Sequence, residues 1–370
     1  MKKIKLLILA DLRSAHTKKW AEVLSEFGLE VHLFGLTPPE EEFRGVTIHS
    51  GEVKSETAYA GETSLKKFGY FFELNRLNKL ILSLKPDIVH SHYATSYGLL
   101  GALAGRKPYF ISVWGSDVVS FPNKSPLHKK MLKYALSRAD LLFSTSEFMA
   151  AVTRKYTDKE IIITPFGVDT EKFAPSERQK DESKIRIGMI KTLSTSYGQE
   201  HLLRAFAIVK EKLPEFRLEL EITGGGSDLS RLKKISGELG IEGFTKFTGY
   251  VKQDEIPEVH KNLDIEVYPT VIEETFGVST VEAMACGIPC IVSKTGGLQY
   301  LIEDGESGYH APIGDHKAIA EILFKLVADK NLRLKIGKGA RKRVEEKYDI
   351  KQNAKIMTDA YERVLTKKGE

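Results

Sequence analysis

The sequence predicts two α/β domains in tandem, each a doubly wound, Rossmann-like parallel sheet covered by helices. The chain has 370 residues, more than one hydrophobic core usually holds. Short apolar runs alternate with helical patterns along most of its length, as in parallel sheets. The polar segment 174–183 has no apolar periodicity and is the best linker candidate. We therefore expect domains at 1–167 and 168–349.

The first half supplies the strands and helices of one such domain. Strands are expected at 4–10, 30–34, 88–90, 109–114, 141–144 and 161–164, and helices at 17–27, 65–84, 96–104, 127–137 and 147–156. Ligands of parallel sheets bind where the strands end. This rule singles out the segments 11–17, 90–92, 114–117 and 145–147.

The second half repeats the alternation. Strands are expected at 185–190, 217–223, 246–250, 265–269 and 290–293, and helices at 199–212, 229–239, 254–262, from about 278, and within 316–346. A last helical pattern covers 350–365. We expect the segment 350–370 to pack back on the first domain.

The densest set of candidate functional residues lies around a predicted helix start. Glu274 and Glu282 flank Phe276 and Gly277, which stand at the expected loop-to-helix junction. A helix beginning near Val278 offers its first amides, which lack intrahelical partners, to an anion such as a diphosphate. Two carboxylates beside it suit a ligand with hydroxyl-rich ends, and a nucleotide sugar has that shape. Alternatively, the same apolar stretch is an ordinary core helix.

The composition narrows the class of protein. The only cysteines, Cys286 and Cys290, stand in an apolar segment, which predicts buried, reduced thiols and a cytoplasmic protein. The apolar run 4–10 stops at Asp11, so a strand is expected there rather than a signal peptide. No segment approaches the roughly 18 apolar residues of a membrane span.

A metal is not expected. His16, His90 and His92 lie near predicted strand ends, but no cysteine or carboxylate pattern accompanies them. The chain contains no Asp-x-Asp triplet, the usual sign of a divalent metal at a nucleotide-sugar site. We therefore expect chemistry without a metal or another cofactor.

Positive charge is concentrated in the first half. Through Pro165 the Lys and Arg residues outnumber Asp and Glu by 23 − 17 = +6, which leaves 32 − 33 = −1 for the rest. The stretches 65–72 and 124–133 combine lysines with aromatic or apolar residues, which fits a surface that contacts anionic lipid. The alternative is helices docked on a sheet with solvated lysines. Nucleic acid is not expected, because no binding motif accompanies the charge.

Weaker signals stand at other strand ends. The segment 224–226 is three glycines between a strand and a helix, where backbone can approach a ligand or simply form a tight turn. Lys191 ends a strand and faces phosphates or solvent. Asp117 is an N-cap candidate for the segment that follows it, and this role does not exclude a functional one.

These residues, in this order, resemble a known family. The matching segments are 164–169, 188–191, 224–226, 247–251, 268–270, the block from Glu274 to Glu282, 296–297 and 304–308, with looser matches at 87–92 and 114–117. Together they resemble the retaining glycosyltransferases of the GT-B fold, family 4, over nearly the whole chain. The resemblance implies two Rossmann-like domains with a cleft between them.

The resemblance also implies roles for individual residues. On the donor side it implies that Glu274 binds the donor sugar and that Glu282 binds the ribose. The diphosphate is expected to contact Lys191 and the amides of Gly277, Val278 and Ser279, which follow Phe276. The nucleobase is expected near Gly225, Tyr250 and Val251. On the acceptor side it points to His16, His92, Trp114 and Asp117. It implies Glu274, Lys191 and Asp117 as the catalytic residues.

The sequence departs from the family pattern in three places. Tyr197 stands where a second lysine usually precedes a glycine, so Lys191 has more phosphate charge to neutralise. Trp114 replaces the usual histidine of a His-Gly-x-Asp motif. The loop after the first strand carries Arg13 and His16 instead of glycines.

The implied activity is transfer of a sugar from a nucleoside diphosphate sugar to a hydroxyl group, with retention at the anomeric carbon. A glycan or a lipid-linked acceptor of cell-envelope polysaccharide synthesis is expected, at the inner face of the membrane. A nucleotide-sugar epimerase of the same architecture and a sugar-nucleotide binding protein without turnover are the alternatives.

Overall fold

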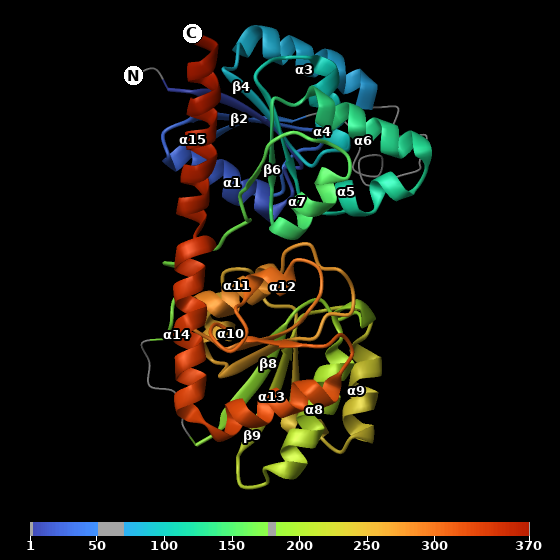
Figure 1. Ribbon diagram of the computed structural model, residues 1–370, viewed down its shortest axis with the longest axis vertical. Helices are drawn as coiled ribbons and strands as arrows, with labels where there is room; N and C mark the ends of the chain where they lie inside the picture. The colour runs from blue at the N-terminus through green and yellow to red at the C-terminus, as the bar shows by residue number, and fades with distance from the viewer. Residues whose placement is uncertain (1–2, 51–69, 177–182, 370) are drawn as a thin grey trace. The chain divides into compact units, whose positions relative to one another are not determined.

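The computed structural model describes residues 3–50, 70–176 and 183–369, which form two compact units (Figure 1). The first unit combines Met1–Phe166 with Lys351–Glu370, and the second is Gly167–Ile350. The chain passes to the second unit before the polar segment 174–183, of which residues 177–182 lie outside the described ranges. Phe173 is already buried within the second unit.

The first unit is built on a seven-stranded parallel sheet in the order β3-β2-β1-β4-β5-β6-β7. The strands are β1 (Lys5–Leu9), β2 (Glu30–Gly35), β3 (Val46–Ser50), β4 (Ile88–His92), β5 (Tyr109–Val113), β6 (Leu141–Ser144) and β7 (Ile161–Ile163). Every residue of β4, β5 and β6 is buried, as expected for parallel strands covered on both faces. The strand order reverses between β1 and β4, and ligands bind at such a switch point.

Helices cover both faces of this sheet: α1 (Ala15–Glu26), α3 (Tyr70–Leu84), α4 (Ser96–Ala104), α5 (Ser116–Val119), α6 (Pro126–Arg138), α7 (Glu147–Arg154) and α15 (Ile350–Gly369). Alternate strand residues divide between two cores. Val89, Ile111 and Leu142 pack in one cluster with apolar residues of α3, α4, α6 and α7. Helix α15 lies along the first unit (Figure 1). Its Tyr361 ring lies 5.5 Å from the Phe110 ring, and the Tyr361 hydroxyl group forms a hydrogen bond with His90 Nδ1 at 2.6 Å.

The second unit has a six-stranded parallel sheet in the order β10-β9-β8-β11-β12-β13. Its strands are β8 (Ile185–Ile190), β9 (Leu218–Thr223), β10 (Thr245–Gly249), β11 (Ile265–Tyr268), β12 (Cys290–Ser293) and β13 (Tyr309–Ala311). Its helices are α8 (Gln199–Lys212), α9 (Leu229–Glu238), α10 (Ile256–Lys261), α11 (Val278–Ala285), α12 (Leu298–Leu301), α13 (His316–Ala328) and α14 (Lys330–Lys347). The predicted pair of doubly wound parallel sheets is confirmed, and the switch point of this sheet lies between β8 and β11.

Several short elements of the described chain were not expected: the strands β3 and β13, the helices α5 and α12, and the 3-10 helices η2 (Phe121–Asn123), η3 (Thr195–Tyr197) and η4 (Glu242–Phe244). Strand β3 is an edge strand without a fully buried residue, so its sequence shows no strong apolar run. The helix predicted at 65–84 is described from Tyr70 onward, and residues 65–69 lie outside the described part of the chain. Among the described helices, none combines the length and apolar character that crossing a bilayer requires.

Candidate active site

Lys191 and Glu274 meet at the carboxyl edge of the second sheet. Lys191 directly follows β8 and Glu274 lies in the loop after β11, the two strands that flank the switch point. The Lys191 ammonium group contacts Oε1 of Glu274, and both side chains are about 85% shielded from solvent, at 15% and 14% exposure. On its other side the ammonium lies 4.7 Å from the ring centroid of Tyr197. The structure therefore gathers a cation, an anion and an aromatic ring where ligands of this fold bind.

The position of Glu274 is fixed by contacts on its backbone and on its carboxylate. Thr270 Oγ1 donates a hydrogen bond to Oε2 of Glu274 at 3.3 Å. The amide of Gly297 donates to the carbonyl oxygen of Glu274 at 2.5 Å. A Cβ atom on Gly297 would stand 2.4 Å from the carbonyl oxygen of Thr275, so only glycine allows this close approach. The glycine pair predicted at 296–297 thus supports the loop that carries Glu274.

The helix start predicted after Gly277 is present. Helix α11 begins at Val278 with Gly277 as its N-cap, where φ is 103°, and no side chain caps it. Glycine adopts this left-handed conformation readily, whereas other residues do not. Val278 and Ser279, whose amides begin the helix, are partly exposed, so an anion can reach them. Phe276 is buried and its ring packs edge-on against Tyr348 at 5.9 Å, which makes that side chain a support.

Glu282 lies one turn further along α11, above a buried polar cluster. Nδ1 of His260 donates a hydrogen bond to Oε1 of Glu266 at 2.7 Å, and the Tyr268 hydroxyl donates to Oε2 at 2.6 Å. Nε2 of His260 lies 3.8 Å from Oε2 of Glu282. Burial alone would lower the pKa of His260, but the charges of Glu266 and Glu282 and the hydrogen bond to Glu266 raise it to about 9. His260 is therefore a cation at neutral pH.

The glycine turn after β9 lies beside an exposed aromatic ring. The amide of Gly224 donates to the carbonyl oxygen of Gly249 at 2.9 Å, which joins the turn to the end of β10. Gly225 is exposed, and a Cβ built on it would lie 4.0 Å from Cβ of Tyr250. Tyr250 is 81% exposed and Val251 beside it is half-buried. This surface leaves an aromatic face free to stack on a planar group.

In the first unit, the predicted histidines form an aromatic cluster at the ends of β1, β4 and β5. The His16 ring stacks on Phe166 at 3.9 Å, and the His92 ring lies 4.8 Å from Trp114. Burial lowers the pKa of His92 to about 3, and burial together with Lys19 lowers that of His16 to about 4. Both nitrogens of His92 and Nδ1 of His16 have no hydrogen-bond partner among the described residues. Both imidazoles are therefore neutral at pH 7.

Asp117 is a buried carboxylate that organises a loop. It accepts hydrogen bonds from the amides of Ala94 at 2.8 Å and Gly115 at 2.7 Å, and from that of Trp114 at 3.3 Å. The N-cap of α5 is Gly115, so Asp117 does not fill the capping position that its sequence suggested. Burial raises the pKa of its carboxyl group, against these hydrogen bonds. Its position joins the end of β5 to the segment after β4.

Of the predicted donor-side residues, the structure brings Lys191 and Glu274 into contact and places Glu282 on the helix that begins four residues after Glu274. It also adds residues that sequence reasoning missed: Thr270, His260 and Glu266. His260 and Glu266 are fully buried. A carboxylate inside the apolar strand β11 is the signal that could have singled out Glu266, whereas His260 stands between charged residues, Glu258 and Lys261, and gives no such signal. Within the described residues, no group of three His, Cys, Asp or Glu side chains is arranged to hold a metal ion.

The chain matches two family models, one in each half. Residues 170–343 match the model described as glycosyl transferases group 1, and residues 5–146 match one described as glycosyl transferase 4-like. A D-inositol 3-phosphate glycosyltransferase of Corynebacterium jeikeium is 30% identical over 282 residues, which cover 69% of this chain and 67% of the relative.

Two further comparisons extend these matches. An N-acetyl-alpha-D-glucosaminyl L-malate synthase of Bacillus anthracis is 24% identical over 276 residues, which cover 71% of each chain. In the crystal structure of HepE from Anabaena in complex with UDP, the fold matches with a TM-score of 0.79 at 18% identity and covers 97% of this chain and all of the other. At 18% sequence identity, this structural match shows a shared fold only.

Proposed function

The chain belongs to the glycosyl transferases group 1 family, and we propose that it moves a hexosyl group from a nucleoside diphosphate sugar to an acceptor hydroxyl group with retention at the anomeric carbon. The observation that carries this proposal is the Lys191–Glu274 pair beside the uncapped start of α11. A cation and free amides suit a diphosphate, and an adjacent carboxylate suits sugar hydroxyl groups.

Each donor-side residue has a part in the proposal. Lys191 and the amides of Gly277, Val278 and Ser279 would hold the diphosphate, and Glu274 would bind the donor sugar. Glu282 would accept hydrogen bonds from the ribose hydroxyls, while Gly225, Tyr250 and Val251 would meet the nucleobase, with Tyr250 stacking on it. Lys191 must then exchange its contact with Glu274 for phosphate oxygens when the donor binds.

The chemistry we propose is attack from the face that the leaving group occupies. The bond between the anomeric carbon and the diphosphate oxygen breaks, the acceptor oxygen bonds the same carbon, and the acceptor proton passes to the departing phosphate. No protein base is required for this step. Lys191 and the α11 amides stabilise the charge that grows on the leaving group, which is usually the largest contribution to such catalysis.

The acceptor is proposed to involve the cluster of the first unit. His16, a neutral imidazole, and Trp114 are partly exposed, which suits an uncharged, hydroxylated ligand, and the buried His92 would support the Trp114 ring from beneath. Because Asp117 is committed to three backbone amides, its proposed catalytic role is to hold the Trp114–Gly115 loop. A glycan or a lipid-linked cell-envelope acceptor is the class that we propose.

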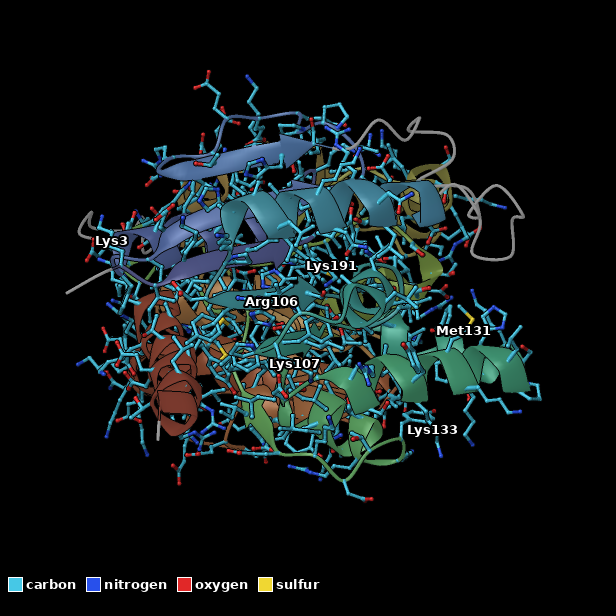
Figure 2. The ribbon with its side chains drawn as sticks, turned by 90° about the horizontal axis from the view of Figure 1, so that it is seen from above. Lys3, Arg106, Lys107, Met131, Lys133 and Lys191 are labelled. Atoms are coloured by element: carbon cyan, nitrogen blue, oxygen red, sulfur yellow. The ribbon has the colours of Figure 1, made fainter. Side chains whose placement is uncertain are left out.

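Contact with anionic lipid at the inner face of the membrane is proposed for α6. Its segment carries Lys124, Lys129, Lys130 and Lys133, together with Leu127 at 64% exposure and Tyr134 at 42%. Met131 and Lys133 are marked on this helix in Figure 2. The second basic stretch, 65–72, lies outside the residues whose side chains are described. Failure of the protein to bind phosphatidylglycerol vesicles at low salt would contradict this contact.

The decisive experiment for the proposed function is a donor panel. UDP, GDP and ADP sugars are tested by thermal shift and by release of nucleoside diphosphate, with and without inositol phosphate, malate or a lipid-linked sugar as acceptor. Acceptor-dependent release with an α-linked product from an α-linked donor supports the proposal. Epimerised sugar without an acceptor, or tight nucleotide binding without release, would replace it with one of the alternatives.

A further inference from the structure

The buried cluster beneath Glu282 contains a ring nitrogen that lies near the Glu282 carboxylate without a hydrogen bond to it. His260 and Glu266 are both completely buried. Glu266 has partners on both carboxylate oxygens, and Nδ1 of His260 is one of them. Nε2 of His260 has no hydrogen-bond partner among the described residues, and the acidic oxygen nearest to it in an ion pair is Oε2 of Glu282, 3.8 Å away.

A core histidine of purely structural use would satisfy both nitrogens, because a buried N–H group without a partner costs free energy. His260 satisfies one. Its ring is fixed in place by Glu266 on one side and by the edge-on ring of Phe173, 6.0 Å away, on another. Nε2 is therefore held in a defined direction, toward a carboxylate that can approach by less than one ångström to close a hydrogen bond.

Glu282 stands between this cluster and the surface. Its side chain retains 8% exposure, whereas those of His260 and Glu266 have none. The Tyr268 hydroxyl lies 2.6 Å from Glu266 and 3.1 Å from the carbonyl oxygen of Ser279, which connects the cluster to the first turn of α11. The Tyr268 hydroxyl group thus links the His260–Glu266 pair to the helix that carries Glu282.

We propose that His260, held by Glu266, is a positioning residue that fixes the Glu282 carboxylate so that its outer oxygen meets the ribose diol of the nucleotide. The inference rests on the proposed function, in which Glu282 binds ribose. A carboxylate held by a cation at one oxygen keeps its other oxygen in a fixed direction. That oxygen can then accept hydrogen bonds from two vicinal hydroxyl groups without first having to be ordered. The His260–Glu266 pair therefore sets the selectivity for ribonucleotide over deoxyribonucleotide donors.

Titration calorimetry with matched nucleotides tests this role. UDP, GDP and ADP are each compared with the 2′,3′-dideoxy counterpart, which lacks the hydroxyl groups. The main variant combines His260→Phe with Glu266→Gln, so that the completely buried carboxylate of Glu266 does not lose its cation and stay charged. We expect it to bind the ribonucleotide about tenfold more weakly and the dideoxy nucleotide as the wild type does. Glu282→Ala sets the scale, because it should abolish the difference between the two nucleotides.

His90→Phe is the matched control, since His90 is an equally buried histidine of the first unit. It should leave the ratio of the two affinities unchanged. A double variant that keeps the wild-type ratio, or that weakens both nucleotides equally, overturns the positioning role. If the double variant shows no cooperative urea transition, Glu266→Gln alone must reduce the preference for the ribonucleotide over the dideoxy nucleotide. An unchanged preference in Glu266→Gln also overturns the proposal.

The outcome also separates this inference from the proposed function. A wild type that binds a nucleotide but does not distinguish it from the dideoxy form keeps the donor site and overturns the ribose role. A wild type that binds none of the nucleotides overturns both.

Discussion

The ammonium nitrogen of Lys191 lies 4.7 Å from the centre of the Tyr197 ring. Tyr197 occupies the sequence position at which the family pattern has a second lysine. An aromatic face attracts a cation through its quadrupole and adds no charge of its own. Tyr197 ends the short η3 helix (Thr195–Tyr197), whose N-cap is Ser194. The ring is thus carried by a defined turn rather than by a loose loop.

Loss of this ring should slow turnover. We expect Tyr197→Ala to lower kcat by about two- to thirtyfold, because the cation loses a contact worth roughly 0.5–2 kcal/mol. Tyr197→Phe keeps the ring and should stay within about twofold of the wild type. Steady-state kinetics of the two variants with the same donor would show whether the ring or the hydroxyl group matters. A Phe variant as slow as the Ala variant would assign the effect to the hydroxyl group.

Removal of either member of the Lys191–Glu274 pair should be more severe. Lys191→Ala and Glu274→Ala are each expected to cut turnover by on the order of a hundredfold or more, as loss of a preorganised charge does at an active site. Lys184 and Glu219 form a comparable pair, 2.8 Å apart, near the opposite end of β8. Lys184→Ala is therefore the control and should leave turnover unchanged. Near-normal rates for Lys191→Ala and Glu274→Ala would rule out the proposed site.

The close approach at Gly297 predicts a sensitive backbone position. In Gly297→Ala the new Cβ atom would stand 2.4 Å from the Thr275 carbonyl oxygen, so the loop carrying Glu274 must move. We expect the free energy of unfolding to fall by about 1–3 kcal/mol. The loss of turnover, expressed as an increase in activation free energy, should be larger than this loss of stability. Gly237→Ala is the control, because a Cβ there meets nothing within 4 Å and lies in α9. That variant should be at least as stable as the wild type.

The first unit should become less stable in mild acid. His16, His90 and His92 have pKa values lowered by burial, so the unfolded chain binds protons that the folded unit does not. Their contribution is present above pH 6.5 and is lost as the pH falls toward 4, at up to about 1.4 kcal/mol per pH unit for each group. Both tryptophans of the chain, Trp20 and Trp114, belong to this unit, so their fluorescence reports its urea transition.

His92→Phe should reduce this pH dependence. The variant removes one of the buried histidines that take up protons on unfolding, and a phenyl ring suits the apolar contact with Trp114. Urea midpoints measured at pH 7 and pH 5 should therefore differ less in the variant than in the wild type. Equal differences would mean that His92 is already protonated in the folded unit at pH 5.

Turnover should not depend on an added metal ion. Phosphate charge in the proposed site is met by Lys191 and backbone amides, so we expect activity in EDTA to equal that in buffer. Nucleotide release measured after dialysis against EDTA, with and without magnesium or manganese, checks this. Activity that is lost in EDTA and restored by either metal would contradict it.

The sequence was most informative where one apolar run decides the structure. The strand 265–269 and a helix from Val278 were expected, and β11 and α11 are found within a residue of those limits. Buried parallel strands read as continuous apolar runs, so their position is encoded locally. The edge strand β3 is partly exposed and carries no such run.

Contacts across the chain could not be predicted in the same way. Lys191 and Glu274 are 83 residues apart, and their meeting follows from the strand order, which places β11 next to β8. The buried pair of His260 and Glu266 was missed because His260 lies among the charged residues of α10 and has the sequence context of a surface group. The carboxylate of Glu266 alone does not show that a histidine six residues earlier is its partner. Asp117 was recognised, but its bonds to three amides depend on the packing of two separate loops.

Because α15 packs on the first unit, the two units are completed in the reverse of their order along the chain. Tyr361 fills a place between Phe110 and His90 in that unit, although the whole second unit is translated before it. Domains usually fold as they leave the ribosome, with the N-terminal one first. Here the second unit has its full set of residues earlier than the first, which waits with an uncovered sheet face until Tyr361 has emerged. The first unit is therefore completed last, after every residue of the second has been synthesised.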